Sequence, residues 1–255
     1  MPLNTNTFEE RLDTATSTES ELEWKNQLLE LIKSNNAVDD FIKTLEPGWQ
    51  NQFLNDYNET PMMAWIHYRR ETPPKEFIGD TSLKNFMGNT ALMYWCIYTD
   101  EKNVPDPLMH DIYITNDEGM VVSMVYMEHR GKEPPHELIV NPVFKDNKGR
   151  TQAMHFLINC FGTLPEIFMH DIYIADNNGN TLEYYSVVYN HRYDPRFEIS
   201  NLYKNAFGDT LVMALIENFG EDIEYVPEHM YHDPKTIVNN NGRSYDDLKR
   251  LYKRH

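Results

Sequence analysis

The feature that most constrains this chain is a tripeptide landmark that recurs about every 30 residues. Gly-x-Thr occurs four times, with three weaker copies, and the third residue of each copy stands at positions 60, 90, 121, 151, 181, 210 and 244. Prolines follow 14 or 15 residues after the first five of these positions. The hexapeptide Met-His-Asp-Ile-Tyr-Ile fills 109–114 and again 169–174, two repeats later. Such registration predicts a structural repeat.

Each landmark has a local physical reason. Glycine supplies the positive φ of a tight turn, and the Thr two residues later can cap a helix by accepting a hydrogen bond from a first-turn amide. Apolar residues then recur at i, i+3 and i+4, as in Leu92, Trp95 and Cys96, which indicates a short helix with one buried face. The proline ends that helix and can begin another, whose first turn carries an acid. Each repeat is therefore predicted to be a turn, a helix, a second turn, a short helix and an extended loop.

The repeats resemble those of ankyrin repeat proteins, whose Gly-x-Thr-Pro-Leu-His segment opens the first of two antiparallel helices. The closest local match is Thr60-Pro61-Met62-Met63-Ala64-Trp65, and the resemblance covers residues 34–255. The repeat is nearer 30 residues than the family's usual ~33, and the family's His is replaced by Met at 63, 93, 124, 154 and 213. The family's Gly-Ala-Asp of the second half is also absent. The resemblance implies an all-α, ankyrin-like helix-turn-helix repeat solenoid with helical N- and C-terminal caps.

The ends of the chain depart from the repeat pattern, so we predict four segments. Residues 1–18, rich in Thr, Asn and Glu, are expected to be loosely ordered. Residues 19–54 form a helical N-terminal cap and a partial repeat, and residues 55–243 form the repeats. Residues 244–255 form a C-terminal capping helix with the polar outer face that a terminal repeat needs.

Composition excludes several classes of function. The chain has 23 Lys and Arg against 40 Asp and Glu, a net charge of −17, which argues against direct binding to nucleic acid. It has no apolar run that would span a membrane. Two cysteines cannot form a disulfide framework, and the N-terminus does not read as a secretory signal. We therefore expect a cytoplasmic protein without membrane contact.

The acidic residues are unevenly distributed. Residues 1–60 carry a net −8, residues 61–150 carry −3, residues 151–229 carry −9 and residues 230–255 carry +3. In a solenoid, charges on successive repeats combine into an extended surface. Such a surface can simply keep the protein soluble, or it can steer the protein to a basic partner, including the nucleic-acid groove of another protein.

Catalytic motifs are scarce. The chain has no nucleophile elbow, no phosphate-binding loop and no paired-Cys zinc pattern. His-Asp pairs occur at 110–111, 170–171 and 232–233. Because equivalent residues of successive repeats are displaced along the solenoid, these pairs are not expected to converge on one point. We interpret them as ending the second helix and bonding local backbone groups. The sequence thus predicts no enzyme, no catalytic residue, no metal and no cofactor.

Cysteine and tyrosine positions give further expectations about packing. Cys96 lies on the buried stripe of a helix and is predicted to be a core thiol, whereas Cys160 lies near a helix end and could be partly exposed. Tyr113, Tyr173 and Tyr203 fall on second helices, where packing between repeats is the expected role.

The resemblance implies that a partner would be bound through the finger-loop tips and the exposed face of each first helix. Carried over position by position, the loop-tip candidates are Tyr57, Phe86, Met87, Asp117, Glu118, Lys148, Asn178 and Phe207. The first-helix candidates are His67, Tyr68, Tyr98, Glu128, His129, Tyr189 and Glu217. Aromatic residues of this kind anchor interfaces, although Phe86, Met87 and Phe207 could instead fold back over a neighbouring repeat.

Two functions fit these observations. The first is a non-enzymatic interaction module that binds a protein partner on its concave face and sequesters or inhibits it. The second is an acidic inhibitor that imitates nucleic acid and blocks a host nuclease or restriction-type defence enzyme, as viral or phage counter-defence proteins can. Salt separates them, because mimicry should weaken steeply with salt and an aromatic-anchored interface should not.

Overall fold

The computed structural model describes residues 6–169, 172–190, 194–197, 203–219 and 237–252. Over these ranges the regular structure is helical, and the only β-type pairings are isolated bridges from Lys145 to Thr151 and from Val238 to Ser244. The predicted all-α repeat architecture is therefore confirmed. The chain forms two compact units, one ending at Asp117 and the other beginning at Glu118, so the division falls inside the predicted repeat array, residues 55–243.

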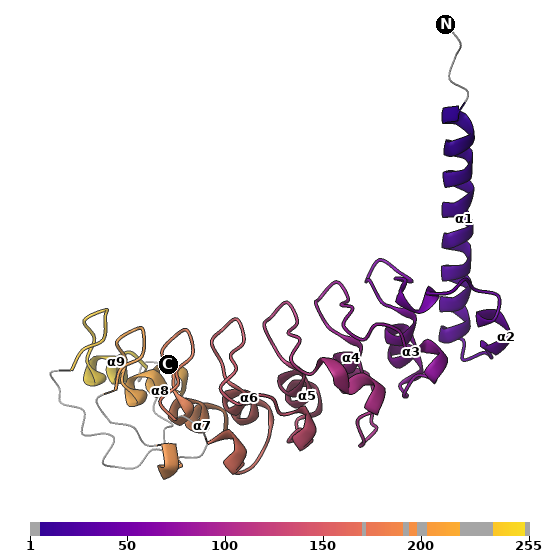
Figure 1. Ribbon diagram of the computed structural model, residues 1–255. Helices are drawn as coiled ribbons and strands as arrows, with labels where there is room; N and C mark the ends of the chain where they lie inside the picture. Colours follow the sequence, from indigo (N-terminus) through magenta and orange to yellow (C-terminus); the bar gives the residue numbers. More distant parts are fainter. Residues whose placement is uncertain (1–5, 170–171, 191–193, 198–202, 220–236, 253–255) are drawn as a thin grey trace, which may run out of the picture. The chain divides into compact units, whose positions relative to one another are not determined.

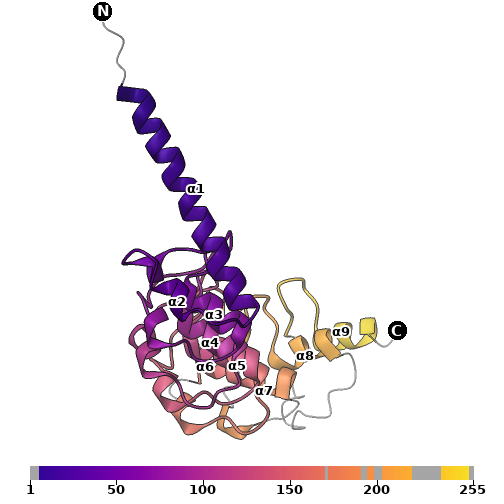
Figure 2. The same ribbon diagram turned by 90° about the vertical axis from the view of Figure 1, so that its right-hand side faces the viewer.

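The first unit begins with a long helix and continues with repeats. Its elements are α1 (Asn6–Lys33), α2 (Asp39–Ile42), η1 (Trp49–Asn51), α3 (Pro61–Arg69), η2 (Lys75–Phe77), α4 (Ala91–Tyr98) and η3 (Asp106–Asp111). Figures 1 and 2 show α2 and α3 beside the C-terminal half of α1, while its N-terminal half extends away from them.

Helix α1 starts earlier than the sequence indicated. Residues 6–18 are helical, where a loosely ordered segment was expected. No Gly or Pro occurs between Leu3 and Glu46, and Glu, Arg and Leu at 9–12 all favour a helix, so nothing local stops the helix short of Asn6.

The core of the first unit joins α1 to the first repeat. Leu28 and Ile32 of α1 are fully buried in one cluster with Trp65 and Phe77. The Phe77 ring lies 4.7 Å from that of Trp65 and 5.1 Å from that of Trp49. Burying a side chain such as Leu28 contributes about 1.5–3 kcal/mol, so this contact is what fixes the N-terminal cap to the repeats.

The second unit consists of repeats and a closing helix. Its elements are α5 (Val122–Arg130), η4 (His136–Leu138), α6 (Gln152–Asn159), η5 (Glu166–Phe168), α7 (Leu182–Asn190), η6 (Pro195–Phe197), α8 (Leu211–Phe219) and α9 (Tyr245–Tyr252). Figure 1 shows the extended loops before α6, α7 and α8 standing side by side on one side of the helices. Apolar residues of α6 and α7, including Phe156, Leu157 and Leu182, form one core, and Val212, Leu215 and Leu248 form the next.

Helix caps follow the predicted pattern. Thr at the N-cap accepts a hydrogen bond from the amide three residues later, and that residue is Met every time, at 3.3–3.5 Å, in the pairs Thr60–Met63, Thr90–Met93, Thr151–Met154 and Thr210–Met213. The closing helix α9 is capped by Ser244, whose hydroxyl accepts from the amide of Asp247 while the Asp247 carboxylate accepts from the amide of Ser244. These bonds satisfy amides that a helix start leaves free.

In four repeats whose second helix the structure describes, that helix is a short 3₁₀ segment. It is reduced to a 3₁₀ turn of three residues after Pro74, Pro135 and Pro165, and of six residues after Pro105. One apolar residue of each turn is buried, as Phe77, Leu108, Leu138 and Phe168 are. With about three residues fewer than the usual ~33-residue repeat, each of these repeats keeps the core contact of its second helix and loses the helix itself.

Candidate protein-binding surface

The finger loops are built on one polar residue. An Asn or Asp stands five residues before each Thr landmark and its copies, at 55, 85, 116, 146, 176, 205 and 239. In the loop before α4, Oδ1 of Asn85 accepts from the amides of Met87 and Asn89 at 3.0 and 2.8 Å. Asp146 does the same for Lys148 and Arg150. This side chain thus fixes the loop around its tip.

Main-chain hydrogen bonds join each loop to the next. In the first unit, the Tyr57 carbonyl accepts from the amide of Phe86 and the Met87 carbonyl from that of Asp117. In the second unit each loop is joined to the next by the same kind of bond, in which a tip carbonyl accepts from an amide of the following loop at 2.8–3.0 Å. The carbonyl–amide pairs are Glu118–Asn147, Lys148–Asn177, Asn178–Ala206 and Phe207–Asn240. The backbones at the loop tips are therefore held by hydrogen bonds to the neighbouring loops, and this orients the tip side chains.

The loops pack so closely that their turns require glycine. Gly88 has φ +75°, and a Cβ there would lie 2.6 Å from the backbone nitrogen of Asp117. Gly149 stands in the same relation to Asn177, at 2.7 Å. Glycine is needed here for its positive φ and for its lack of a side chain.

Three of the four tip candidates of the first unit are exposed aromatic or apolar side chains. Tyr57, Phe86 and Met87 have exposed fractions of 59%, 54% and 49%. The Tyr57 and Phe86 rings lie 5.5 Å apart, so adjacent tips contact each other. Phe86 thus lies partly over the preceding loop, while Phe86 and Met87 both keep about half of their surface in solvent.

The first-helix candidates of this unit form one cluster around a buried carboxylate. Nδ1 of His67 lies 2.8 Å from Oε1 of Glu59, and the imidazole is stacked between the rings of Tyr68 and Tyr98 at 4.4 and 4.3 Å. The Tyr94 hydroxyl donates to the same Glu59 oxygen at 3.0 Å. His67, Tyr68 and Tyr98 were each predicted from the sequence, but the Glu59 carboxylate at the centre of their cluster was not.

The electrostatics of this cluster follow from burial and hydrogen bonding. Burial alone would raise the pKa of Glu59, but hydrogen bonds from His67, Asn55 and Tyr94 outweigh it, so the pKa is lowered and the carboxylate is charged at neutral pH. Burial, then the Glu59 charge, raise the pKa of Tyr94 and Tyr98. Both tyrosines are therefore neutral, and Tyr98, which is partly exposed, offers hydrogen-bonding aromatic surface, whereas Tyr94 is buried.

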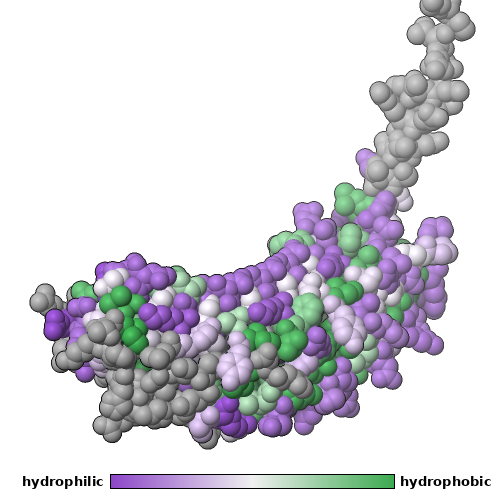
Figure 3. Space-filling model, turned by 60° about the vertical axis from the view of Figure 1, so that its left-hand side comes forward, coloured by the Kyte–Doolittle hydropathy of each residue, from purple (hydrophilic) through white to green (hydrophobic). Residues whose placement is uncertain are grey.

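The candidates of the second unit are mostly polar. Glu118, Lys148 and Asn178 are exposed at the tips, and Phe207, with 54% of its surface exposed, is the apolar tip. On the first helices Glu128, His129 and Glu217 are exposed, and Tyr189 stacks on Tyr185 at 5.6 Å. Partial burial and the nearby Asp209 raise the pKa of Glu217. On the face shown in Figure 3, patches of exposed hydrophobic residues lie among mostly hydrophilic ones. Asp117, the remaining tip candidate, is exposed at the end of the first unit.

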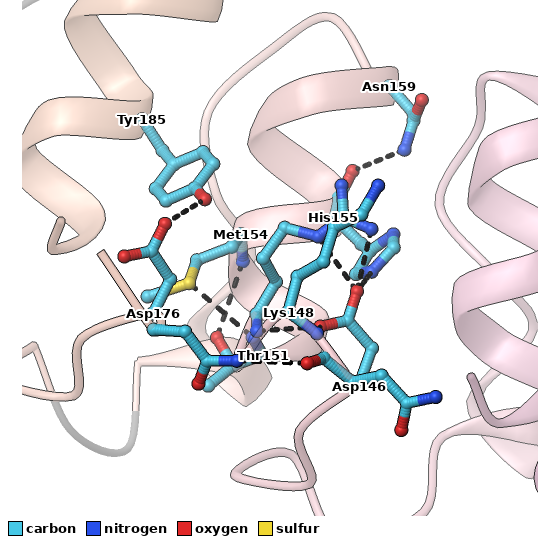
Figure 4. Close-up of polar contacts among 11 residues, drawn as sticks. Asp146, Lys148, Thr151, Met154, His155, Asn159, Asp176 and Tyr185 are labelled. Carbon is cyan, nitrogen blue, oxygen red and sulfur yellow. Dashed lines mark hydrogen bonds and ion pairs between the residues drawn. The ribbon is translucent and has the colours of Figure 1, made fainter. Parts of the chain in front are cut away.

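A buried polar network supports the loops of the second unit (Figure 4). Nε2 of His155 lies 3.0 Å from Oδ2 of Asp146, and Arg150 binds the same oxygen at 2.7 Å. Burial opposes the charge on Asp146, but these partners and the Arg150 amide lower its pKa to about 2. In the next repeat, the Tyr185 hydroxyl donates to Asp176 at 2.8 Å. The His155 and Asp146 side chains are only 2% and 1% exposed, so the pair holds the loop and does not face a ligand.

The predicted His-Asp pairs can be checked at one place. His110 is exposed at the end of η3, and the Asp111 carboxylate accepts a hydrogen bond from the Thr81 hydroxyl of the preceding repeat. Asp111 thus has the structural role that was predicted, but its partner is a side chain of another repeat and not the local backbone. The pairs 170–171 and 232–233 lie outside the described residues.

Two packing predictions were wrong. Tyr113 and Tyr173 are 69% and 65% exposed, because they lie in turns after the short 3₁₀ helices and not on longer second helices. Tyr203 does contact the preceding repeat as predicted, since its hydroxyl donates to the Gly179 carbonyl at 3.1 Å. Cys160 is buried beside Leu164 and Phe168, and burial raises its thiol pKa to about 12. Cys96 is a buried core thiol, as predicted.

The described ranges lack the features of two other kinds of site. None of their helices combines the length and apolar character that crossing a bilayer requires. No three His, Cys, Asp or Glu side chains among the same residues gather as they would around a metal ion.

Comparison with known proteins identifies the fold. No family model matches the sequence, and no curated protein matches it. Among solved structures, the chain is similar to the ankyrin repeat domain of Bcl-3, described as a unique member of the IkappaB protein family. The TM-score is 0.50 at 13% sequence identity, over 72% of this chain and 91% of that chain. The chain therefore has an ankyrin-like repeat fold, which confirms the predicted resemblance at the level of the fold.

Proposed function

We propose that this chain is a non-enzymatic protein-interaction module that binds a partner protein and sequesters or inhibits it. Repeat solenoids of this type present extended surfaces to other proteins. The observation that carries the proposal is that the finger loops of the first unit have hydrogen-bonded backbones but exposed tip side chains. Tyr57, Phe86 and Met87 lose little conformational freedom on binding, because their loops are already fixed by the bonds to Asn55, Asn85 and Asp117.

The contact surface would combine two chemistries. The tips supply apolar anchors, and the neighbouring cluster of Tyr68, Tyr98 and His67 supplies aromatic surface with polar atoms. Aromatic residues of this kind contribute most to binding where a partner removes them from water. In ankyrin repeat proteins the corresponding residues line the concave face, and we assign the same role to the finger loops and first helices of this chain.

A partner pulldown tests this proposal. The full chain is used to capture proteins from the lysate of its host cell, with parallel washes at low and high salt. We expect a partner that survives high salt and is lost when Tyr57, Phe86 and Met87 are all replaced by Ala. The matched control is Phe161→Ala, which removes an aromatic residue that is 95% exposed in the turn after α6.

The same experiment separates the alternative function. The net charge of −17 also fits an acidic inhibitor that imitates nucleic acid and blocks a nuclease or restriction-type defence enzyme. That function predicts nucleic-acid-binding partners that are lost at high salt and are unaffected by the triple alanine variant. Failure to recover any specific partner under either wash would contradict both functions.

A further inference from the structure

The N-terminal cap contains a groove that none of the candidate residues above lines. It has a volume of about 430 Å³ and lies between α1 and the segment that runs from α2 into η1. A volume of this size falls within the range of ligand pockets, about 300–1,000 Å³. Its walls come from Trp24 of α1, from Phe41 and Leu45, and from Trp49 of η1.

The groove joins aromatic walls to carboxylates. Trp24, Phe41 and Leu45 are half-buried against the core of the first unit, which holds them in place. Glu21 and Glu46 also line the groove, and both are exposed to solvent. The segment around them is strongly acidic, since residues 1–60 carry 12 acids and 4 bases, a net −8. Aromatic rings beside carboxylates form an environment that favours a cation over an anion or a neutral group.

Two residues that line the groove, Glu21 and Trp24, already contact a cation of the chain itself. The Lys25 ammonium lies 2.5 Å from Oε1 of Glu21 and 5.8 Å from the centre of the Trp24 ring. Lys25 therefore shows that this carboxylate and this ring can be engaged together by one positive group. Glu46, in contrast, makes no ion pair with any of the described residues.

We propose that this groove binds an arginine side chain of a partner polypeptide, with the guanidinium displacing Lys25 from Glu21 and Trp24 and reaching toward Glu46. Arginine suits the site better than lysine, because its planar guanidinium stacks on indole rings and can serve two carboxylates at once. The same pairing occurs inside this unit, where the Arg69 guanidinium lies 4.0 Å from the Trp65 ring centre. The groove is thus a second interaction surface, independent of the finger loops.

The test uses the four tryptophans as reporters. The full chain is labelled with 5-fluorotryptophan, the resonances are assigned by single Trp→Phe substitutions, and the peptide acetyl-Leu-Arg-Leu-amide is titrated in. We expect the Trp24 and Trp49 resonances to shift and saturate, while those of Trp65 and Trp95, which are buried in α3 and α4, stay in place. The matched peptide with citrulline, a neutral isostere of arginine, should give no saturable shift.

Two variants should change the affinity for the arginine peptide in opposite directions, and a third is the control. Glu46→Gln should weaken the arginine peptide about fivefold, the upper range for an exposed charge pair. Lys25→Met should tighten it, because the competing ammonium is gone. Glu71→Gln is the control, since it makes the same charge change at an exposed residue of the same unit outside the groove.

Several results would overturn the proposal. Equal weakening by Glu46→Gln and Glu71→Gln would reduce the effect to general attraction by an acidic protein. Equal binding of the citrulline peptide, or shifts spread evenly over all four tryptophans, would remove the arginine site. Unchanged affinity in Lys25→Met would show that the guanidinium does not occupy the place of that ammonium. Circular dichroism on each variant confirms that the fold is intact.

Discussion

The two units each contain a His-carboxylate pair, and the two pairs differ in what surrounds them. In the first unit, His67 and Glu59 are 2.8 Å apart, and 32% of the His67 side chain reaches solvent between two tyrosine rings. In the second unit, His155 and Asp146 are 3.0 Å apart, and 2% of the His155 side chain is exposed. The first pair belongs to a surface that a partner can contact, and the second belongs to the scaffold.

The finger loops show the same contrast. The backbone ladder from tip to tip is common to both units, but the tips carry Tyr57, Phe86 and Met87 in the first unit and Glu118, Lys148 and Asn178 at the start of the second. One backbone framework therefore displays two kinds of side chain. The difference teaches that the framework is set by turn chemistry, while the exposed side chains are free to carry binding.

The largest expected effect on stability comes from removing one member of the buried His155–Asp146 pair. His155→Ala removes a fully buried imidazole and one partner of Asp146, so we expect it to lower the free energy of unfolding by about 3 kcal/mol. His67→Ala, at the exposed pair, should cost about 1 kcal/mol, and His129→Ala, at an exposed position on α5, less than 0.5 kcal/mol. Urea unfolding of the three variants measures this order. Equal losses at His155 and His67 would contradict the division into scaffold and surface.

Next in size is the close packing of finger loops. Gly149→Ala would place a Cβ 2.7 Å from the backbone of Asn177, whereas Gly242, with a similar φ in the equivalent turn, has nothing within 4 Å. We expect losses of about 2–3 kcal/mol and about 1 kcal/mol respectively, because both substitutions force Ala into positive φ but only the first also separates two loops. Thermal unfolding compares them. A loss at Gly242→Ala as large as at Gly149→Ala would remove the argument from loop contact.

The stability of the second unit should depend on pH in the acid range through Asp146. The folded pKa of Asp146 is about 2, below the usual ~3.9 of an aspartate, so its contribution to stability is complete above pH ~4 and is lost as pH falls through ~2. The shift corresponds to about 2 kcal/mol. Urea unfolding across this acid range should show that slope in the wild type and a shallower one in Asp146→Asn. An unchanged slope in that variant would assign the acid sensitivity to other carboxylates.

The smallest expected effect concerns helix caps within the second unit. Thr151 caps α6 with its hydroxyl, whereas Val121 at the equivalent position of α5 makes no side-chain cap. Thr151→Val should therefore cost about 1 kcal/mol, and Val121→Thr should gain up to about 1 kcal/mol. Thermal unfolding of both variants is the measurement. A destabilised Val121→Thr would mean that burying the hydroxyl outweighs the cap.

Much of the fold could be predicted from local patterns. The Gly-x-Thr spacing predicted the turn, the cap and the start of each first helix, and the Thr60, Thr90, Thr151 and Thr210 caps confirm it. The residue that shapes the finger loop was missed, although its signal was present as an Asn or Asp five residues before each landmark. The landmark predicts the helix that follows it, whereas this Asn or Asp acts in the loop that precedes it.

Other errors arose because the burial of a side chain depends on contacts outside its own helix. Cys160 looked like a partly exposed helix end, and its burial comes from Leu164 and Phe168 in the following turn. Tyr113 and Tyr173 were placed on second helices that the structure reduces to 3₁₀ turns, which leaves both tyrosines exposed. The groove at Trp24 and Trp49 had no sequence signal, because its walls come from segments about 25 residues apart.

By itself, the sequence determined the period, the turns, the caps and the all-α repeat class. The turns and caps depend on residues within a few positions of one another, and the period is the spacing at which these local patterns recur. Only the tertiary structure decided which side chains meet. Glu59 gathers His67 and Tyr94 from two repeats, and Asp117 fills the space beside Gly88. Such contacts depend on how one repeat packs on the next, and that packing is the sum of many weak apolar contacts that no single motif encodes.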